Sequence, residues 1–410
     1  MIILIEPQCR GFQHEKCNAG AVALYLNAFP DDDIHFFAEK SHLSSVIEIL
    51  DLGKIKLERL FLHEIQIPES KLLSKISIVY SYYKLFSEVI ENTFFTSEKI
   101  KRVVLLSAYS FNLLAFKILR FRLLKNLEVN IFSHGSIEVL HKNFIFNPVL
   151  NIKRGLNVVF NKLGLNFIFK VSFYKNLHDL LLKPVIYFGG NKNIKYILFR
   201  KDSVDEFTKI LPYLSENTIC IDLPFVDYAK CQVNESLVFS YIYKQKENNF
   251  EFLSDSNFSI KPQKPHFFNI YESKRLFLNL SLVPNDRFNF FIQKPIDRSR
   301  SEVDSFILNS KYIIYLNQED SYVLTTSGAF FDAILLEKPI LFLKNPCFDY
   351  YFREYKYGYR FEHIIDLKNK IVEIINHGDH NYETFIEEIK KLKKFVSIEN
   401  NFKKLLNEKI

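Results

Sequence analysis

Four small residues precede an amphipathic apolar run in the last third of the chain: Thr325, Thr326, Ser327 and Gly328. The surrounding pattern predicts a buried strand over residues 322–324, a turn, a helix, and a second buried strand that ends at Leu343. At such a helix start, free backbone N–H groups and the positive end of the helix dipole can hold an anion, and a diphosphate suits them best. Asp332, one turn into the helix, would then reach a sugar hydroxyl of the same ligand. An ordinary strand–helix–strand crossover capped by Ser or Thr gives the same local pattern.

A second group of polar residues lies in a loop predicted over residues 7–20, after a buried strand at residues 2–5: Arg10, Gly11, His14, Glu15 and Asn18. Ligands of open α/β sheets bind beyond the carboxyl ends of the strands, so this loop is a candidate acceptor site. His14 or Glu15 could take the proton from an attacking hydroxyl. A polar loop followed by a helix with an acid in its first turn is an equally good interpretation.

A third candidate is the segment Ser-His-Gly-Ser-Ile-Glu at residues 133–138, which follows a buried strand at residues 129–132. His134 would lie at the carboxyl end of that strand, and Glu138 would follow one helical turn later as a candidate acceptor-binding residue. A lone histidine is more often structural than functional, but a position at a strand end favours a role in binding or catalysis.

Length and composition restrict the class of protein. A chain of 410 residues exceeds one compact core and predicts two domains, and 48% apolar residues suffice to build both. The five cysteines are scattered and lack close pairs, which indicates a reducing, cytoplasmic setting. The first apolar run is short and has no basic leader, and no apolar segment reaches about 18 residues. We therefore expect neither secretion nor a membrane-spanning segment.

Positive charge is concentrated between Lys117 and Lys195. That stretch contains 13 Lys or Arg and 3 Asp or Glu (13 − 3 = +10), whereas the whole chain has a net charge of +7. Apolar residues alternate with these cations, which is typical of helices that dock on an anionic membrane surface. The alternative, which we favour slightly, is an internal helix with a solvated charged face.

Strand and helix patterns alternate along most of the chain and predict mainly parallel sheets with helices on both faces. The simplest architecture has two doubly wound halves joined near residues 224–236. We predict an N-terminal domain over residues 1–226, a second domain over 236–380 and a helical tail over 381–410. The predicted strands cover residues 2–5, 34–38, 102–107, 129–133, 195–199, 218–223, 237–243, 288–292 and 312–316. The predicted helices cover residues 21–29, 71–92, 111–125, 204–214, 249–255, 301–308 and 382–409.

The C-terminal half resembles the donor-binding domain of bacterial glycosyltransferases of GT-B architecture, of the type that builds O-antigen, capsule and other surface polysaccharides. The resemblance is carried by residues 310–315 (SKYIIY), 324–333 (LTTSGAFFDA), 338–346 (KPILFLKNP) and 350–358 (YYFREYKYG). It implies two Rossmann-like, doubly wound α/β domains that face each other across a cleft. It also implies transfer of a sugar from a nucleotide sugar to a growing, lipid-linked or oligosaccharide acceptor, at the inner face of the cell membrane.

The resemblance also assigns roles to individual residues. The turn at residues 325–328 would hold the donor diphosphate, and Asp332 a sugar hydroxyl. Lys244 and Lys246, with Arg298 as a weaker candidate, would stabilise the charge that builds on the leaving group. His134 would touch the donor sugar or the acceptor. Many retaining members carry a glutamate eight positions before the site of Asp332, but Leu324 occupies that place here, so inversion or retention stays open.

Several alternatives remain at the level of the sequence. No Asp-x-Asp pair lies at a strand end, and residues 31–33 (DDD) belong to a turn, so we expect no catalytic metal and no cofactor. The same fold could transfer a polyol phosphate, sialic acid or Kdo. A nucleic-acid-binding protein, or a non-catalytic partner in glycan assembly, is a further alternative, although the basic stretch lacks a recognisable nucleic-acid module.

Overall fold

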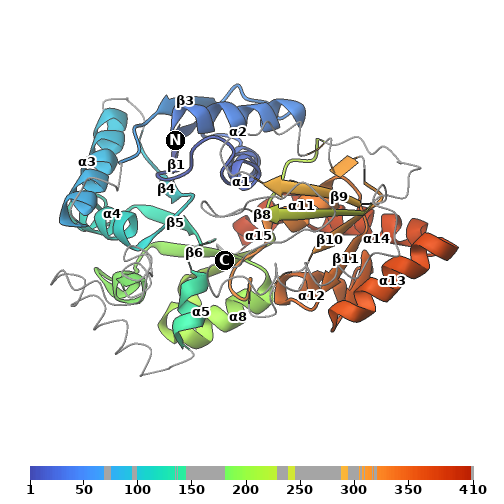
Figure 1. Cartoon of the computed structure of the whole chain (residues 1–410). Helices are drawn as coiled ribbons and strands as arrows, with labels where there is room; N and C mark the ends of the chain where they lie inside the picture. The colour runs from blue at the N-terminus through green and yellow to red at the C-terminus, as the bar shows by residue number, and fades with distance from the viewer. Residues whose placement is uncertain are drawn as a thin grey trace, which may run out of the picture.

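The computed structural model describes residues 1–68, 75–94, 99–133, 135, 137–144, 181–228, 239–244, 288–293, 304, 307–308, 310–315, 317 and 321–407. Within these ranges the chain forms two separate sheets, one of seven strands and one of five. Each sheet has helices packed against it, and the two sheets lie side by side (Figure 1). The predicted class, α/β with two doubly wound parallel sheets, is therefore confirmed.

The first sheet is parallel throughout and has the strand order β3-β2-β1-β4-β5-β6-β7. This is the order of a Rossmann sheet extended by one strand, with its topological switch point between β1 and β4. The central strands are entirely buried because both faces are covered, as expected for parallel strands. The strands are β1 (Ile2–Ile5), β2 (Ile34–Ala38), β3 (Leu60–Glu64), β4 (Arg102–Leu105), β5 (Glu128–Phe132), β6 (Ile194–Phe199) and β7 (Thr218–Ile221).

Helices cover both faces of this sheet. Ile2 and Leu4 pack with α1, α2 and the last helix of the chain, α15 (Ile398–Asn407). Ile3 and Ile5 pack with α3, α4 and α8 on the opposite face. The helices are α1 (Glu15–Ala28), α2 (Lys40–Leu52), α3 (Lys75–Phe94), α4 (Ser110–Leu123), α5 (Glu138–Phe144), α8 (Lys201–Ile210) and the 3-10 helix η1 (Pro212–Asn217).

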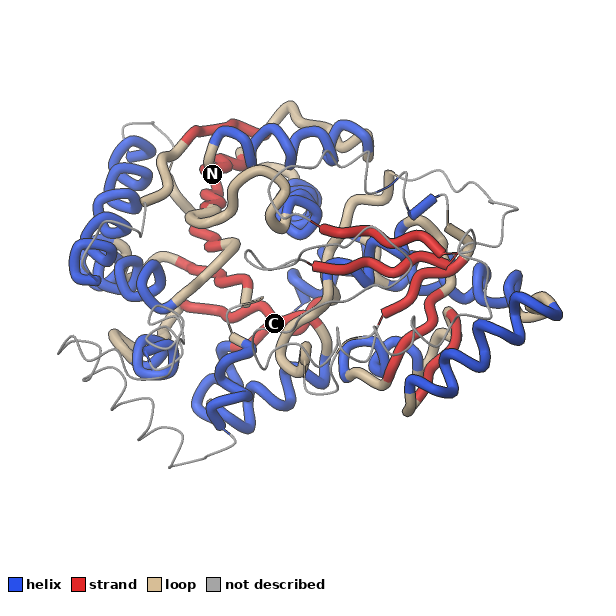
Figure 2. Tube along the Cα trace, viewed as in Figure 1, coloured by secondary structure: helices blue, strands red, loops and turns tan. Residues whose placement is uncertain are grey.

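The second sheet is also parallel and has the order β12-β11-β10-β8-β9. Its switch point lies between β8 and β10, because the chain adds β9 on one side of β8 and all later strands on the other. The strands are drawn together in red in Figure 2. They are β8 (Phe239–Lys244), β9 (Phe288–Gln293), β10 (Tyr312–Tyr315), β11 (Ile340–Leu343) and β12 (Gly358–Phe361).

Three helices, α11, α12 and α13, alternate with or follow the last strands of the second sheet, and two more helices end the described chain. The charged tail is a pair, α14 and α15, and α15 returns to the first domain, where it packs on α1 and β7. Its Asn401 side chain accepts a hydrogen bond from the backbone N–H of Asp222 at 2.8 Å, and Lys404 pairs with the Asp222 carboxylate. The helices are α11 (Gly328–Leu335), α12 (Pro346–Phe352), α13 (Ile364–His377), α14 (Tyr382–Phe395) and α15 (Ile398–Asn407).

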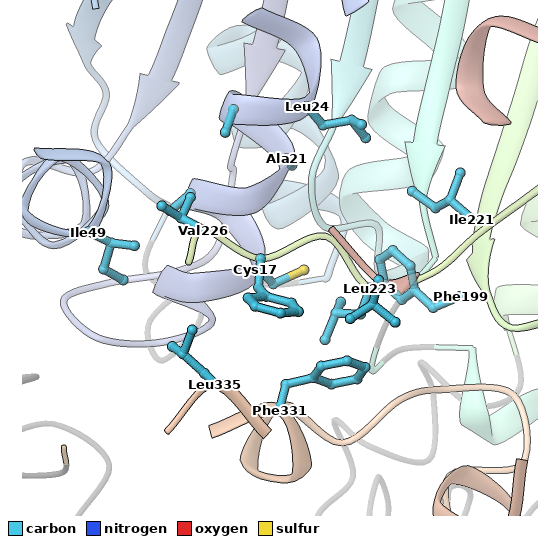
Figure 3. Close-up of a cluster of buried hydrophobic side chains, with 14 of the residues drawn as sticks. Cys17, Ala21, Leu24, Ile49, Phe199, Ile221, Leu223, Val226, Phe331 and Leu335 are labelled. Carbon is cyan, nitrogen blue, oxygen red and sulfur yellow. The ribbon is translucent and has the colours of Figure 1, made fainter. Parts of the chain in front are cut away.

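One apolar core runs across the junction of the two domains. Figure 3 shows Phe331 and Leu335 of α11 directed toward side chains of the first domain, among them Cys17 of α1 and Leu223 after β7. The Phe225 and Phe331 rings lie 5.9 Å apart between centroids. The segment after β7 thus joins the two domains covalently and also contributes to the packing between them.

Gly20 explains why the start of α1 was predicted too late. The prediction placed residues 7–20 in a loop, but α1 begins at Glu15 and Gly20 lies inside it. A Cβ on Gly20 would lie 2.1 Å from the carbonyl oxygen of Pro224. The glycine is therefore required because the connecting backbone crosses α1 at this point, and not because it ends a loop.

Other sequence predictions were also wrong or incomplete. Residues 322–324 are not a strand; the strand before α11 is β10. The helix α2 and the strand β3 were not predicted from the sequence. The residues of β3 do not alternate between buried and exposed positions. The predicted helix at 249–255 lies outside the described residues. Among the described residues, no helix is long and apolar enough to cross a membrane.

Candidate functional site

The start of α11 lies next to the switch point of the second sheet. Ser327 caps the helix, and its hydroxyl accepts a hydrogen bond from the N–H of Phe330 at 3.4 Å. Gly328 is exposed, and a Cβ there would meet nothing within 4 Å. In the part of the chain that the structure describes, no acceptor is bonded to the N–H groups of Gly328 and Ala329. Two amides and the helix dipole therefore meet at an open position, which is the arrangement that binds anions.

Lys244 is the last residue of β8, the strand that pairs directly with β10. The carboxyl ends of β8 and β10 flank the switch point, where ligands of open parallel sheets bind. The backbone thus brings Lys244 to the same end of the sheet as the α11 start. Lys246 and Arg298, the other predicted cations, lie outside the described residues.

The predicted anion-binding turn is partly engaged by a carboxylate of the protein itself. Glu138 accepts hydrogen bonds from the N–H groups of Val323, Leu324 and Thr325 at 2.8, 3.1 and 3.1 Å. The hydroxyl of Thr325 donates to the same carboxylate at 2.9 Å. Glu138, predicted to contact the acceptor, therefore binds the loop that leads into α11. We call residues 322–327 the α11 loop.

A buried arginine binds the carbonyl groups of the same loop. Nη2 of Arg200 donates to the carbonyl oxygens of Tyr322 and Val323, both at 2.9 Å, and to Ser203 Oγ at 2.6 Å. The hydroxyl of Thr326 donates to the carbonyl of Phe199 at 3.2 Å. Sequence reasoning missed Arg200, although a basic residue directly after a buried strand at the ligand-binding edge was a usable signal.

Asp332, the predicted hydroxyl-binding carboxylate, is paired with Lys16 of α1. Both side chains are largely buried, and the Lys16 ammonium also lies 3.9 Å from a carboxylate oxygen of Asp304 and 5.6 Å from the centroid of the Tyr228 ring. Because Lys16 is the second residue of α1, this ion pair connects the start of α1 to α11 of the second domain. Lys16 was not among the predicted site residues.

The predicted acceptor loop is organised by Glu6, which is fully buried at the end of β1. Its carboxylate accepts from the backbone N–H of Gln8 at 2.9 Å and of Cys9 at 3.0 Å, and from Asn18 Nδ2 at 3.0 Å. The Asn18 side chain also lies 2.8 Å from Nε2 of His42. Asn18 is thus enclosed within the first domain, so its polar side chain stabilises the loop.

Arg10 and Gly11 lie on the outer part of this loop. Arg10 is exposed and its Nη2 donates to the carbonyl of Ile67 at 3.4 Å. The Gly11 N–H donates to Ser41 Oγ at 2.9 Å, and its carbonyl lies 2.8 Å from Nδ1 of His42. Burial lowers the pKa of His42, so its imidazole is held neutral in this network.

The two candidate bases in the loop have different environments. His14 is exposed and has left-handed backbone angles at the cap of α1, whereas Glu15 is buried in the first turn of that helix. Both precede Lys16, the residue that contacts Asp332. His134, the third candidate, lies outside the described residues; its neighbours Ser133 and Gly135 are buried and exposed, respectively.

The cysteines that the structure describes lie apart from the other candidate residues in their chemistry. Cys9, Cys17, Cys220 and Cys347 are not in disulfide bonds within the described part of the chain. Burial raises the pKa of Cys9, and the Glu6 carboxylate adds to that effect, so the thiolate form is disfavoured. No group of three or more potential metal ligands occurs within the described ranges.

Comparisons with solved structures identify the fold. A glycosyltransferase from Rickettsia africae matches with 12% identity and a TM-score of 0.53, over 99% of this chain and 96% of that chain. HepE of Anabaena, solved with UDP and glucose, matches with 11% identity and a TM-score of 0.55, over 99% and 98%. A TarM mutant of S. aureus, solved with UDP among other ligands, matches with 11% identity and a TM-score of 0.53, over 99% of each chain. The chain has the GT-B fold.

No protein-family model matches the sequence, and no curated protein matches it significantly. The identities to the solved structures are low, so these matches establish the GT-B fold and leave activity to be argued from the residues.

Proposed function

We propose that this GT-B protein is a glycosyltransferase that moves a sugar from a nucleoside-diphosphate sugar to an acceptor hydroxyl. The observation that carries the proposal is the open pair of amides at Gly328 and Ala329, beside the switch point of the second sheet. Asp332 lies one turn further along the same helix, where a carboxylate can bind a hydroxyl of the nucleotide ribose or of the sugar. The two similar structures solved with UDP support a uridine nucleotide.

The chemistry follows from the charge that develops on the leaving diphosphate. The N–H groups at the start of α11 and the cations Lys244, Lys246 and Arg298 would stabilise that charge without a metal ion. A base, His14 or Glu15 of the N-terminal loop or His134 after β5, would take the proton of the acceptor hydroxyl if the reaction inverts the anomeric centre. A ligand hydroxyl that binds Asp332 would share this carboxylate with Lys16.

A panel of nucleotides tests the donor class. Isothermal titration calorimetry with UDP, GDP, CDP and CMP is expected to show tightest binding of UDP, the nucleotide held by two of the similar structures. CMP should bind more weakly than the diphosphates, because two open amides and the helix dipole at the start of α11 suit a diphosphate. Preferential binding of CMP would favour the alternative of a sialic acid or Kdo transferase, and a cytidine diphosphate preference a polyol-phosphate transferase. If no nucleotide binds, and salt-sensitive binding of duplex DNA appears instead, the transferase proposal fails.

For the acceptor, we propose a growing surface glycan, such as an O-antigen, capsule or lipooligosaccharide, presented at the cytoplasmic face of the membrane. The specific observation is a set of exposed apolar side chains on α4, the segment 181–188 and η1, one of which, Phe121, has its ring centroid 5.6 Å from Nζ of Lys125. Tyr187 and Tyr213 stack there, with ring centroids 4.1 Å apart. The exposed side chains are Ile118, Phe121, Tyr187, Phe188 and Tyr213.

Part of the basic stretch is nevertheless structural. Nζ of Lys117 donates to the carbonyls of Ile186 and Phe188 at 2.5 and 3.1 Å and to Asn191 Oδ1 at 3.0 Å. Burial lowers the pKa of Lys117 to about 7. Lys117 therefore holds the end of the helical segment 181–187 in place, as the internal-helix alternative predicts for this residue, and residues 145–180 lie outside the described ranges.

Vesicle flotation tests the membrane contact. With vesicles containing about one third anionic lipid, Phe121→Ser is expected to reduce the bound fraction severalfold, because it removes an exposed aromatic ring from the contact. Tyr80→Ser, which changes an exposed aromatic residue on α3, is the matched control and should leave binding unchanged. Equal flotation of Phe121→Ser and the wild type would remove this surface from the proposal.

A further inference from the structure

The α11 loop belongs to the second domain in sequence but is held by the first. Glu138 of α5 binds its amides, Arg200 after β6 binds its carbonyls, and the side chain of Leu324 is fully buried among apolar residues of the first domain. We propose that Glu138 and Arg200 are positioning residues, which set the backbone of the α11 loop so that the start of α11 can grip a nucleoside diphosphate. This inference rests on the proposed function.

The Glu138 contact is a strong one by type and number. One carboxylate accepts three successive backbone N–H groups and one hydroxyl, and charge-assisted hydrogen bonds are about twice as strong as neutral ones. Three adjacent amides can converge on one acceptor only in a narrow range of backbone angles, so the contact fixes the conformation of residues 323–325.

Arg200 fixes the opposite, carbonyl side of the same stretch. Its side chain is fully buried, and Nη2 bonds the carbonyls of Tyr322 and Val323 while Nε bonds Asp202 Oδ1 at 3.0 Å. Its own backbone has a φ of 104°, a strained value for a residue with a side chain. Such strain persists where the surrounding structure over-determines a residue and is concentrated at functional sites.

The positions of the bonded amides argue that Glu138 shapes the ligand site and does not fill it. The carboxylate is bound to the amides of residues 323–325, whereas Gly328 and Ala329, whose amides have no acceptor among the described residues, follow three to six positions later. Between them, Thr326 binds the carbonyl of Phe199 and Ser327 caps α11. The first domain thus holds the α11 loop as far as Thr326, the residue before the cap Ser327. The position of the first turn of α11 therefore depends on these contacts. Nucleotide affinity should consequently depend on residues of the opposite domain.

Glu138→Gln is the direct test, because it keeps the size of the side chain and replaces one acceptor oxygen by an N–H donor that opposes the loop amides. We expect UDP, titrated by calorimetry, to bind about tenfold more weakly, in line with the loss of charge-assisted hydrogen bonds. Glu373→Gln makes the same chemical change on α13, where Glu373 pairs with Lys370 at 2.7 Å, and should leave UDP affinity unchanged. The same or tighter UDP binding in folded Glu138→Gln would overturn the inference.

A second pair of variants separates positioning from general stability. Thr325→Val removes the hydroxyl bonded to Glu138, and Thr325→Ser restores it; we expect weaker UDP binding in the first and recovery in the second. Combining Thr325→Val with Glu138→Gln should add little further loss, because both changes break one contact. Fully additive losses would contradict a shared role. These variants also serve if Glu138→Gln does not fold.

Hydrogen exchange distinguishes failure of this inference from failure of the proposed function. If wild-type protein binds no nucleotide, the donor assignment fails, but the clamp still predicts faster exchange of the amides of residues 323–325 in Glu138→Gln than in wild type. Amides within α1 serve as the internal reference. Unchanged exchange in the loop would show that Glu138 does not hold it, whatever the ligand.

Discussion

Replacing Gly328 by valine is expected to abolish binding of the nucleotide donor while leaving the fold intact. Gly328 is the first residue of α11, and it is exposed at the point where two amides have no acceptor in the described part of the chain. A Cβ at Gly328 would meet no protein atom within 4 Å, so the position is open. A valine side chain would occupy this open space, which the proposed diphosphate requires. The fold tolerates the change because the backbone of Gly328 is not left-handed, so valine adds no backbone strain.

The expected changes in UDP affinity and in stability distinguish Gly328 from a glycine that is needed only for packing. For Gly328→Val, UDP affinity should fall at least about 100-fold, since the ligand phosphate and a branched side chain cannot share one position, while stability should change by less than about 1 kcal/mol. Gly328→Ala should give an intermediate loss. Gly20→Ala is the contrasting control: its Cβ would meet the Pro224 carbonyl at 2.1 Å, so it should lower stability by about 1–3 kcal/mol.

Calorimetry with UDP and thermal unfolding of the same samples measure both effects. If Gly328→Val binds UDP like the wild type, the phosphate does not lie at the start of α11, and the donor assignment based on this helix is lost. If it unfolds instead, the open position described for Gly328 is wrong. The two results are distinct because one concerns only the ligand and the other only the chain.

The local features of the donor side could be predicted from the sequence because they are encoded within a few residues. Hydroxyl residues followed by glycine and an amphipathic run predicted a capped helix, and α11 begins at Gly328 with Ser327 as its cap. Alternating buried strands and helices predicted two parallel sheets. The apolar run at residues 322–324 was misread as a strand because Leu324 is buried by docking on the first domain, which a local pattern cannot distinguish from burial in a sheet.

The contacts that complete the site could not be predicted, because they join residues far apart in the chain. Glu138 and Val323 are separated by 185 positions, and Lys16 and Asp332 by 316. A single sequence shows each of these residues as an ordinary charged side chain. Only the packing of the two domains makes Glu138 an acceptor for the α11 loop and Lys16 the partner of Asp332. Asn18 shows the opposite case. The sequence suggested a ligand-binding residue, but the Asn18 side chain donates a hydrogen bond to the buried Glu6 carboxylate of its own domain.

Replacing His134 by alanine is expected to reduce turnover at least about 100-fold with little loss of nucleotide affinity, which is the scale of a lost acid–base or oxyanion contact. His134 itself lies outside the described residues, but residues on both sides of it in the chain are described. β5 ends at Phe132, and Glu138, four residues after His134, reaches the α11 loop. In the chain, His134 therefore lies between the end of β5 and a residue that binds the α11 loop.

The measurement is release of UDP from its sugar nucleotide, compared with UDP affinity by calorimetry. His141→Ala is the matched control, because His141 lies in α5 with its Nδ1 3.5 Å from a Glu206 carboxylate oxygen and should leave turnover unchanged. If His134 is the base, wild-type activity should fall as the pH drops through the histidine range near about 6.5, because only the neutral imidazole accepts a proton. His134→Ala should lack that dependence. Wild-type rates in His134→Ala would exclude His134 and leave His14 and Glu15 as the candidate bases.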